Sequence, residues 1–291
     1  MNKSRFFALF TVLTWATNSA VVKSLLSEIP NMQALSVSSF VAFLFLLAVN
    51  LKNGSLREMK KYSLRQYGYM AVLGFTGMFL YSALYYFGLT QLTAQEACII
   101  NYLWPLMLVL FSCLLLKEKL TVMKITALVC SFIGIVILSS GGAASAGGNR
   151  GAGVFCCIAA AAFYGLFSIL NKKADFDQSI SMMIFWLTTA LCGLFGGLLT
   201  ESWIPMGGIQ WVGMLWLGAV INGAAYLTWA LALKDADNTA AIANLAYLTP
   251  FISVIISAIF LNEGFHPRAI IALVFIVGGI LLQSFFDRKS A

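Results

Sequence analysis

Residues 101–120 read NYLWPLMLVLFSCLLLKEKL, and residues 246–265, at an offset of 145, read AYLTPFISVIISAIFLNEGF. Both stretches place a tyrosine before a proline, continue with an apolar run, and end near a glutamate. An apolar run of this length without strand-like alternation indicates a helix that crosses a membrane. The two stretches therefore predict two copies of one membrane-embedded unit.

The similarity between the two copies extends well beyond these stretches. At the offset of 145, chemically distinctive residues coincide: Tyr81 with Tyr226, Tyr102 with Tyr247, Pro105 with Pro250, Glu118 with Glu263, and Gly134 with Gly279. Near the start of each copy the offset is 149, which pairs Trp15 with Tyr164, Ser19 with Ser168, and Lys23 with Lys172. We expect a first repeat over residues 1–140, a Gly/Ala/Ser-rich linker over 141–150, and a second repeat over 151–291.

The composition requires that most of the chain faces lipid. Of the 291 residues, 60% are hydrophobic and 10% are charged, whereas a soluble domain carries about 25% charged residues. The net charge of +7 does not indicate nucleic-acid binding, because the basic residues form short clusters between apolar spans. The six cysteines lie in apolar segments without metal-ligand spacing, which favours small core residues over disulfides or a metal site.

Hydropathy predicts an all-α integral membrane protein with ten transmembrane helices. A span needs about 20 mainly apolar residues to cross the bilayer, and an N-terminal span followed by a counterpart in the second repeat is expected to be retained rather than cleaved. The predicted spans are 6–26, 33–51, 67–88, 94–116, 121–140, 151–171, 180–200, 209–232, 239–261 and 267–286.

Charge distribution predicts the orientation. With ten spans, fifteen of the eighteen basic residues fall on the side of the termini, and only Lys23, Arg150 and Arg268 fall on the opposite side. By the positive-inside rule, both termini are cytoplasmic. Five spans is an odd number, so the second repeat must be inverted relative to the first. Two inverted five-helix repeats are typical of secondary transporters that work by alternating access.

The paired motifs resemble the drug/metabolite transporter superfamily, in particular its EamA-type ten-helix members. The matching elements are a proline in the fourth span of each half and an acidic residue at the end of that span: Pro105 with Glu118, and Pro250 with Glu263. The shorter stretch QEACIINYLWP, residues 95–105, looks more narrowly like bacterial aromatic amino acid exporters. This resemblance implies export of a small metabolite across a bacterial inner membrane, through a central cavity lined by spans 1, 3, 4, 6, 8 and 9.

The resemblance also implies a substrate class and a membrane environment. The substrate is expected to be a small molecule, most readily an amino acid including aromatic ones, while a nucleobase, amine, sugar or drug stays an alternative. The protein is expected to reside in the lipid bilayer as a monomer or weak homodimer, with no cofactor, no metal and no nucleic acid. Export, import, proton coupling, exchange and facilitated diffusion all stay open.

Polar and aromatic residues recur at helical spacing on the spans that would line the cavity. Asn and Ser in hydrocarbon must find partners inside the bundle, either on neighbouring helices or in a wet cavity, and an aromatic wall with few charges suits a small, partly apolar solute. The predicted cavity residues are Trp15, Asn18, Ser19, Tyr81, Tyr85, Glu96, Asn101, Trp104, Tyr164, Ser168, Asn222, Tyr226, Trp229, Asn244 and Tyr247.

Individual residues carry narrower predictions. Glu96 lies near the outer end of span 4 without a basic neighbour in sequence, so it either binds a substrate ammonium or a proton, or is an interfacial carboxylate wet by water. Pro105 and Pro250 predict hinges at symmetric positions, or else static kinks. Glu118 and Glu263 are expected to act as interfacial caps or ion-pair partners.

Two basic residues complete the set. Lys23 either extends to the lipid headgroups or reaches into the outer vestibule of the transporter. His266, beside Pro267 in an outer loop, is expected to be a surface residue.

Other classes of membrane protein fit less well. An intramembrane enzyme would need paired aspartates within the spans, an HExxH motif, or Ser and His on facing helices. None of these is found, since Asp175, Asp177, Asp235 and Asp237 fall in predicted cytoplasmic connections and the single histidine falls in a loop. A channel would favour rings of charge or filter loops. We therefore expect no catalytic residues.

Overall fold

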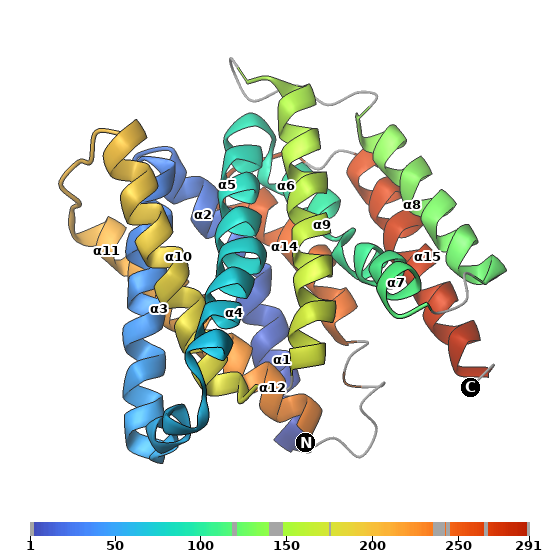
Figure 1. The fold of residues 1–291 in the computed structure, drawn as a ribbon. Helices are drawn as coiled ribbons and strands as arrows, with labels where there is room; N and C mark the ends of the chain where they lie inside the picture. Colours follow the sequence, from blue (N-terminus) through green and yellow to red (C-terminus); the bar gives the residue numbers. More distant parts are fainter. Residues whose placement is uncertain are drawn as a thin grey trace.

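The computed structural model describes residues 3–117, 121–139, 148–174, 176–234, 242, 245–264 and 267–289, and within these residues it contains helices and connections but no strand. The expectation of an all-α membrane protein is confirmed. Figure 1 shows the helices running in roughly one bundle, with the N-terminus at one end. We call the opposite end, at the top of Figure 1, the distal end.

The first repeat folds as a series of helices and helical segments, several of which join end to end. They are α1 (Lys3–Ala16), α2 (Asn18–Leu26), α3 (Asn31–Asn53), the 3₁₀ segment η1 (Ser55–Lys61), α4 (Leu64–Gly74), the π segment η2 (Phe75–Leu80), α5 (Tyr81–Gln91), α6 (Ala94–Asn101), α7 (Trp104–Leu115) and α8 (Val122–Ser139).

The second repeat follows a similar order. Its elements are α9 (Arg150–Ala174), α10 (Gln178–Thr200), α11 (Gly208–Leu215), the π segment η3 (Trp216–Ala225), α12 (Tyr226–Lys234), the 3₁₀ segment η4 (Ala246–Leu248), α14 (Thr249–Phe260) and α15 (Pro267–Lys289). The predicted linker lies mostly outside the described residues, and Arg150, assigned to it from sequence, is instead the first residue of α9.

Seven of these helical stretches are long and apolar enough to cross a membrane. They are Lys3–Leu26, Asn31–Asn53, Leu64–Gln91, Ala94–Leu115, Arg150–Ala174, Gln178–Thr200 and Gly208–Ala232. Three further apolar helices are shorter: Val122–Leu138, Ala246–Phe260 and Pro267–Leu282. The chain is therefore a multi-pass membrane protein. Each of the ten predicted ranges overlaps one of these helices, and ten membrane crossings stay a prediction.

Local sequence explains where several helices begin. The Thr93 hydroxyl accepts a hydrogen bond from the amide of Glu96 at 3.2 Å, which caps the start of α6. Asp177 caps α10 by accepting from the amides of Ser179 and Ile180, each at 3.0 Å. Such side-chain oxygens satisfy the first amides of a helix, which have no partner within it.

Several predicted spans are interrupted near their middle. The span predicted at 94–116 is two helices, because α6 ends at Asn101 and α7 begins at Trp104, with Pro105 in the first turn of α7. Proline fits a first helical turn, where its missing N–H has no intrahelical acceptor to lose. In the second repeat Pro250 similarly occupies the first turn of α14. An interruption thus lies just before each proline, at the positions where the sequence predicts a hinge or a static kink.

The π segments are a second kind of interruption. Tyr81 directly follows η2 and Tyr226 directly follows η3, so the two segments occupy matching positions in the two repeats. A π turn adds a residue to the helical register and is frequent at functional sites. Neighbouring helices approach η3 closely, because a Cβ built on Gly218 would lie 2.4 Å from the carbonyl oxygen of Ser38 on α3.

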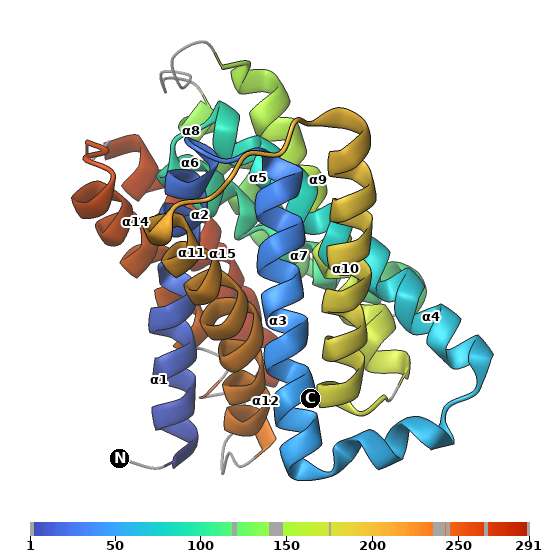
Figure 2. The same cartoon turned by 90° about the vertical axis from the view of Figure 1, so that its left-hand side faces the viewer.

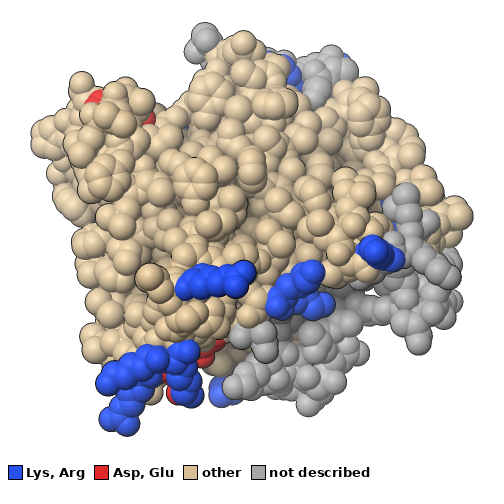
Figure 3. All heavy atoms as spheres, viewed as in Figure 1, with Lys and Arg blue, Asp and Glu red and all other residues tan. Residues whose placement is uncertain are grey.

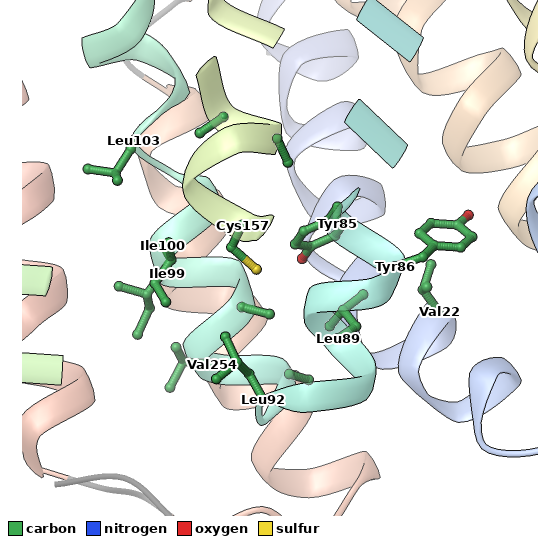
Figure 4. Close-up of a cluster of buried hydrophobic side chains, with 14 of the residues drawn as sticks. Val22, Tyr85, Tyr86, Leu89, Leu92, Ile99, Ile100, Leu103, Cys157 and Val254 are labelled. Atoms are coloured by element: carbon green, nitrogen blue, oxygen red, sulfur yellow. The ribbon is translucent and has the colours of Figure 1, made fainter. Parts of the chain in front are cut away.

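Pairs of helices from different repeats hold the bundle together. Helix α3 packs along α10, as both views of the fold show (Figure 1 and Figure 2), and α8 packs along α15 (Figure 1). The core between α2, α5, α6, α9 and α14 is apolar, with Tyr85, Leu89, Ile99 and Ile100 almost completely buried (Figure 4). This core surrounds the interrupted helices.

Candidate functional site

A cavity lies at the level of the helix interruptions. Its lining comes from both repeats: the α1–α2 junction, α5, α6 and the break before α7, then α9, α10, η3, α12 and α14. Its volume, counted as the space open to the centre of a water molecule, is about 90 Å³. Interrupted helices leave backbone groups without intrahelical partners, and such backbone is tolerated at membrane depth where it lines a cavity or is buried in protein.

The structure brings most of the predicted cavity residues together. Those that line the cavity are Trp15, Asn18, Ser19, Tyr81, Tyr85, Asn101, Trp104, Tyr164, Asn222 and Tyr226. The same wall contains residues that the sequence analysis did not select: Ser82, Tyr86, Cys98, Tyr102, Trp186, Ile221 and Thr249. All of these side chains are uncharged, and many are aromatic.

Aromatic contacts shape the cavity wall. The Tyr164 ring lies 4.9 Å from the Tyr81 ring and 5.3 Å from the Trp104 ring, centroid to centroid. The Tyr226 ring lies 5.2 Å from Trp15 and 6.1 Å from Trp186. Tyr164 thus contacts two rings of the N-terminal half, while Tyr226 contacts Trp15 of that half and Trp186 of its own half.

Hydrogen bonds fix the orientation of several wall residues. The Asn101 amide donates to the hydroxyl of Tyr81 at 3.1 Å, and Ser19 shares a 2.9 Å hydrogen bond with the hydroxyl of Tyr85. The Tyr102 hydroxyl donates to the carbonyl oxygen of Ala246 at 2.6 Å, which ties the break in one repeat to the start of η4 in the other.

Four polar groups of the wall have no protein partner. They are the indole N–H of Trp15 and of Trp186, the amide oxygen of Asn101, and the hydroxyl of Thr249. Trp186 is 2% exposed and Thr249 is 4% exposed, so both groups are buried in the cavity wall. Unpaired buried donors and acceptors cost free energy, and in a cavity wall they are groups that a solute can satisfy.

Some predicted site residues are placed elsewhere. The Ser168 hydroxyl donates to the carbonyl oxygen of Tyr164 within α9, and Trp229 packs against Trp15 at 5.5 Å between ring centroids. Tyr247 packs against the apolar core without lining the cavity. Asn244, Glu118 and His266 lie outside the described residues.

Glu96 does not line the cavity but forms an ion pair with Arg150. Its carboxylate oxygens lie 2.8 and 3.1 Å from the guanidinium nitrogens of Arg150, and the Glu96 side chain is 5% exposed. The same guanidinium donates to the carbonyl oxygen of Leu138 at 2.8 Å. The basic partner was invisible in the local sequence because it lies 54 residues away, at the start of α9.

Other charged groups at the distal end are also engaged. The Lys23 ammonium donates to the carbonyl oxygens of Leu89 and Leu92, at 2.7 and 2.5 Å, near the C-terminal end of α5. Cations are favourable at helix C-termini, where carbonyl groups lack partners. Glu263 caps a helix as expected, although the helix is α6, from the other repeat.

Comparisons with known proteins agree with this architecture. The model of the EamA-like transporter family matches twice, over residues 2–140 and 151–285. The aromatic amino acid exporter YddG of Ancylobacter novellus is 26% identical over 83% of this chain and 85% of its own length. The uncharacterized transporter YvbV of Bacillus subtilis is 27% identical over 94% and 88%.

A solved crystal structure shares the fold along nearly the whole chain. It superimposes with a TM-score of 0.69 at 22% sequence identity and covers 98% of both chains. The two family matches together span most of the sequence, including every element that lines the cavity. The chain belongs to the EamA-like transporter family.

Proposed function

We propose that this protein is a secondary transporter that moves small metabolites, most readily amino acids including aromatic ones, through the central cavity by alternating access. The observation that carries the proposal is the cavity itself, which lies between interrupted helices from both repeats and has unpaired polar groups among aromatic rings. The aromatic amino acid exporter among its relatives supports both the substrate class and export as the direction.

The cavity wall suits a zwitterionic amino acid in chemical terms. Indole N–H groups donate, as a carboxylate requires, while the Asn101 amide oxygen accepts, as an ammonium requires. Aromatic rings such as Tyr81 and Tyr164 offer apolar surface to a side chain and a favourable face to a cation. The described wall residues carry no formal charge, so they favour a solute whose own charges balance.

An inverted pair of five-helix repeats supports alternating access. Each of the first five of the ten helical stretches has a counterpart five places later in the chain. The contact between α5 and α9 therefore corresponds to the contact between α12 and α1, and the contact between α7 and α9 corresponds to that between α14 and α1; all four contacts occur. The pairs α3 with α10 and α8 with α15 are each formed by two counterparts. Two equivalent halves can exchange conformations to open either face.

The proposed orientation places both termini in the cytoplasm of a bacterial cell, with the protein in the inner membrane. Basic residues on the described loops, including Lys52, Arg57, Lys60 and Lys61, are exposed. Figure 3 shows Lys and Arg along the lower part of one face, toward the end that holds the N-terminus. Basic residues are retained preferentially on the cytoplasmic side, so the distal end is proposed to face outward.

Transport by purified protein in liposomes tests the proposal. Liposomes loaded with radiolabelled tryptophan or phenylalanine are expected to lose the label with time. Tyr164→Ala, which removes a central ring of the cavity wall, should reduce the rate at least roughly tenfold, the cost of losing one good aromatic contact. Phe155→Ala on the same helix is the matched control, because Phe155 is 70% exposed on the lipid-facing surface.

Either of two outcomes would contradict the proposal. Folded protein that releases none of the tested amino acids would remove this substrate class. Equal effects of Tyr164→Ala and Phe155→Ala would remove the central cavity as the pathway.

A further inference from the structure

At the distal end of the molecule, Glu263 of the C-terminal half contacts the start of α6 in the N-terminal half. One carboxylate oxygen of Glu263 accepts from the amide of Ala94 at 2.7 Å, and the other accepts from the amide of Gln95 at 3.1 Å. A carboxylate at a helix N-terminus satisfies amides that lack intrahelical partners and interacts favourably with the helix dipole. These are charge-assisted hydrogen bonds, which are stronger than neutral ones.

The side chain of Gln95 donates hydrogen bonds in the opposite direction, from α6 to the connection after α14. Its amide donates to the carbonyl oxygens of Glu263 and Gly264, at 3.4 and 3.2 Å. Gln95 is 1% exposed, so this pairing is shielded from competing water. The first turn of α6 and the connection that follows α14 therefore hold each other by four hydrogen bonds.

Backbone geometry directs Glu263 toward α6. Helix α14 ends at Phe260, and Asn262 adopts a left-handed conformation with φ of 51°. A residue in this conformation turns the chain back at a helix C-terminus, and asparagine tolerates it better than most residues do. The turn thus places the next residue, Glu263, against a helix of the other repeat rather than on its own.

The contact lies directly above the cavity wall. Helix α6 carries Ala94 and Gln95 in its first turn and presents Cys98 and Asn101 to the cavity further along, while α14 contributes Thr249. Helices α6 and α14 pack against each other. An opening that separates α6 from α14 at the distal end would break the Glu263 contact.

A second carboxylate offers a comparison at the same end of the molecule. Glu201, after α10, caps α3 by accepting from the amide of Met32 at 2.9 Å and from that of Gln33 at 3.2 Å. This cap also joins the two repeats, but α3 and α10 pack along their length, and no residue of α3 lines the cavity, whereas α6 lines it at Cys98 and Asn101. Glu201 therefore has the same chemistry as Glu263 without its position over the cavity.

We propose that Glu263 is the residue that holds the distal entrance closed, and that release of the α6 N-terminus from its carboxylate opens the cavity to that side. The inference rests on the proposed alternating access, and it names the contact that controls one of the two openings. Glu263 is not part of the cavity wall. It is proposed to act as a positioning residue, by holding the N-terminus of α6 in place.

Cys98 provides a native reporter for this opening. It is buried, 6% exposed, and belongs to the cavity wall on α6. In a background where Cys113, Cys130, Cys156, Cys157 and Cys192 are replaced by alanine, a membrane-impermeant maleimide added to intact cells labels Cys98 only when the distal entrance opens. Glu263→Gln keeps the size of the side chain and removes its charge.

The expected result is faster labelling of Cys98 in the Glu263→Gln variant. Loss of one charge-assisted hydrogen bond corresponds to roughly a tenfold rise in the open population, and so in the labelling rate. Gln95→Ala, which removes the reciprocal contacts and leaves Glu263 intact, should raise the rate as well. Glu201→Gln should leave the rate at that of the parent protein.

Two results would overturn the proposal. One is an unchanged labelling rate in both Glu263→Gln and Gln95→Ala, with folding verified by gel filtration and thermal unfolding. The other is an equal acceleration in Glu201→Gln, which would mean that any lost cap loosens this end. Labelling needs no substrate, so failure to transport amino acids would remove the proposed substrate while leaving this test decisive for Glu263.

Discussion

The ion pair with Arg150 changes the role that is assigned to Glu96. From sequence, Glu96 was a lone carboxylate in an apolar span and a candidate for substrate or proton binding. In the structure it also accepts from the amide of Thr93 at 3.4 Å, and its pairing with Arg150 joins α6 to the start of α9. A carboxylate with these partners is well suited to holding helices in place.

Removing one partner of this pair is expected to destabilise the protein. Arg150→Met leaves the Glu96 carboxylate buried without its cation, which costs about 3 kcal/mol or more. Adding Glu96→Gln removes the stranded charge, so the double variant should be more stable than Arg150→Met alone. Thermal unfolding in detergent measures the order, and a double variant less stable than either single variant would contradict this role.

A second prediction at this scale concerns Trp186. Its indole N–H is buried in the cavity wall without a partner, so Trp186→Phe removes a donor while keeping an aromatic ring. If the donor binds a substrate carboxylate, the half-saturating amino acid concentration should rise roughly tenfold, the value of a hydrogen bond to a charged group. The amino acid amide, which has no carboxylate, should compete equally with both proteins. Equal loss for acid and amide would assign Trp186 to packing alone.

At the scale of helices and segments, the family resemblance implied which spans line the cavity, and helical spacing selected residues on them, but neither predicted how the helices are interrupted. Helical spacing identified Tyr81 and Tyr85 on α5 and Asn222 and Tyr226 on η3 and α12, and the structure places all four in one wall. The π segments that precede Tyr81 and Tyr226 are mostly apolar, and the sequence analysis treated them as uninterrupted α-helix. Trp186 was missed because span 7, which is α10 in the structure, is not among the six spans that the resemblance gives as lining the cavity.

The close packing of η3 gives a prediction for its glycines. A Cβ on Gly218 would lie 2.4 Å from a backbone oxygen of α3, which cannot move as a side chain would. Gly218→Ala is therefore expected to lower the unfolding temperature, with an energetic cost of about 1–3 kcal/mol. Gly278→Ala on α15 is the matched control, because nothing lies within 4 Å of its Cβ position. It should be neutral or slightly stabilising, and equal effects of both would mean that η3 is not tightly packed.

For the whole molecule, the internal repeat is the feature for which the sequence pattern and the helix contacts can be compared directly. The coincidence of Tyr, Pro and Glu at one offset predicted two related halves, and the helix contacts of the structure are consistent with them. The pairing of the halves at the distal end was out of reach, since Glu263 and Ala94 lie 169 residues apart and only tertiary packing brings them together. Long-range polar contacts of this kind have no local signal in a sequence.

The charges of the cavity wall determine what we expect for the coupling of transport to a proton gradient. The cavity wall of the described residues contains no titratable carboxylate, and Glu96 is held by Arg150. We therefore expect facilitated or weakly coupled transport, in which amino acid efflux keeps its rate within about twofold when a pH gradient is imposed across the liposome membrane. Efflux measured with and without a proton ionophore checks this. Strict dependence on the gradient would show that a proton-carrying group acts in the cycle.

The most direct test of a carrier with a single alternating site is counterflow in liposomes. Vesicles are loaded with a high concentration of unlabelled phenylalanine and placed in a trace of the labelled amino acid. The account predicts that label accumulates transiently inside to a concentration above that outside, because each outward-moving molecule returns the site for an inward one. Label that only equilibrates, without this overshoot, would indicate a channel-like path and would contradict alternating access through the central cavity.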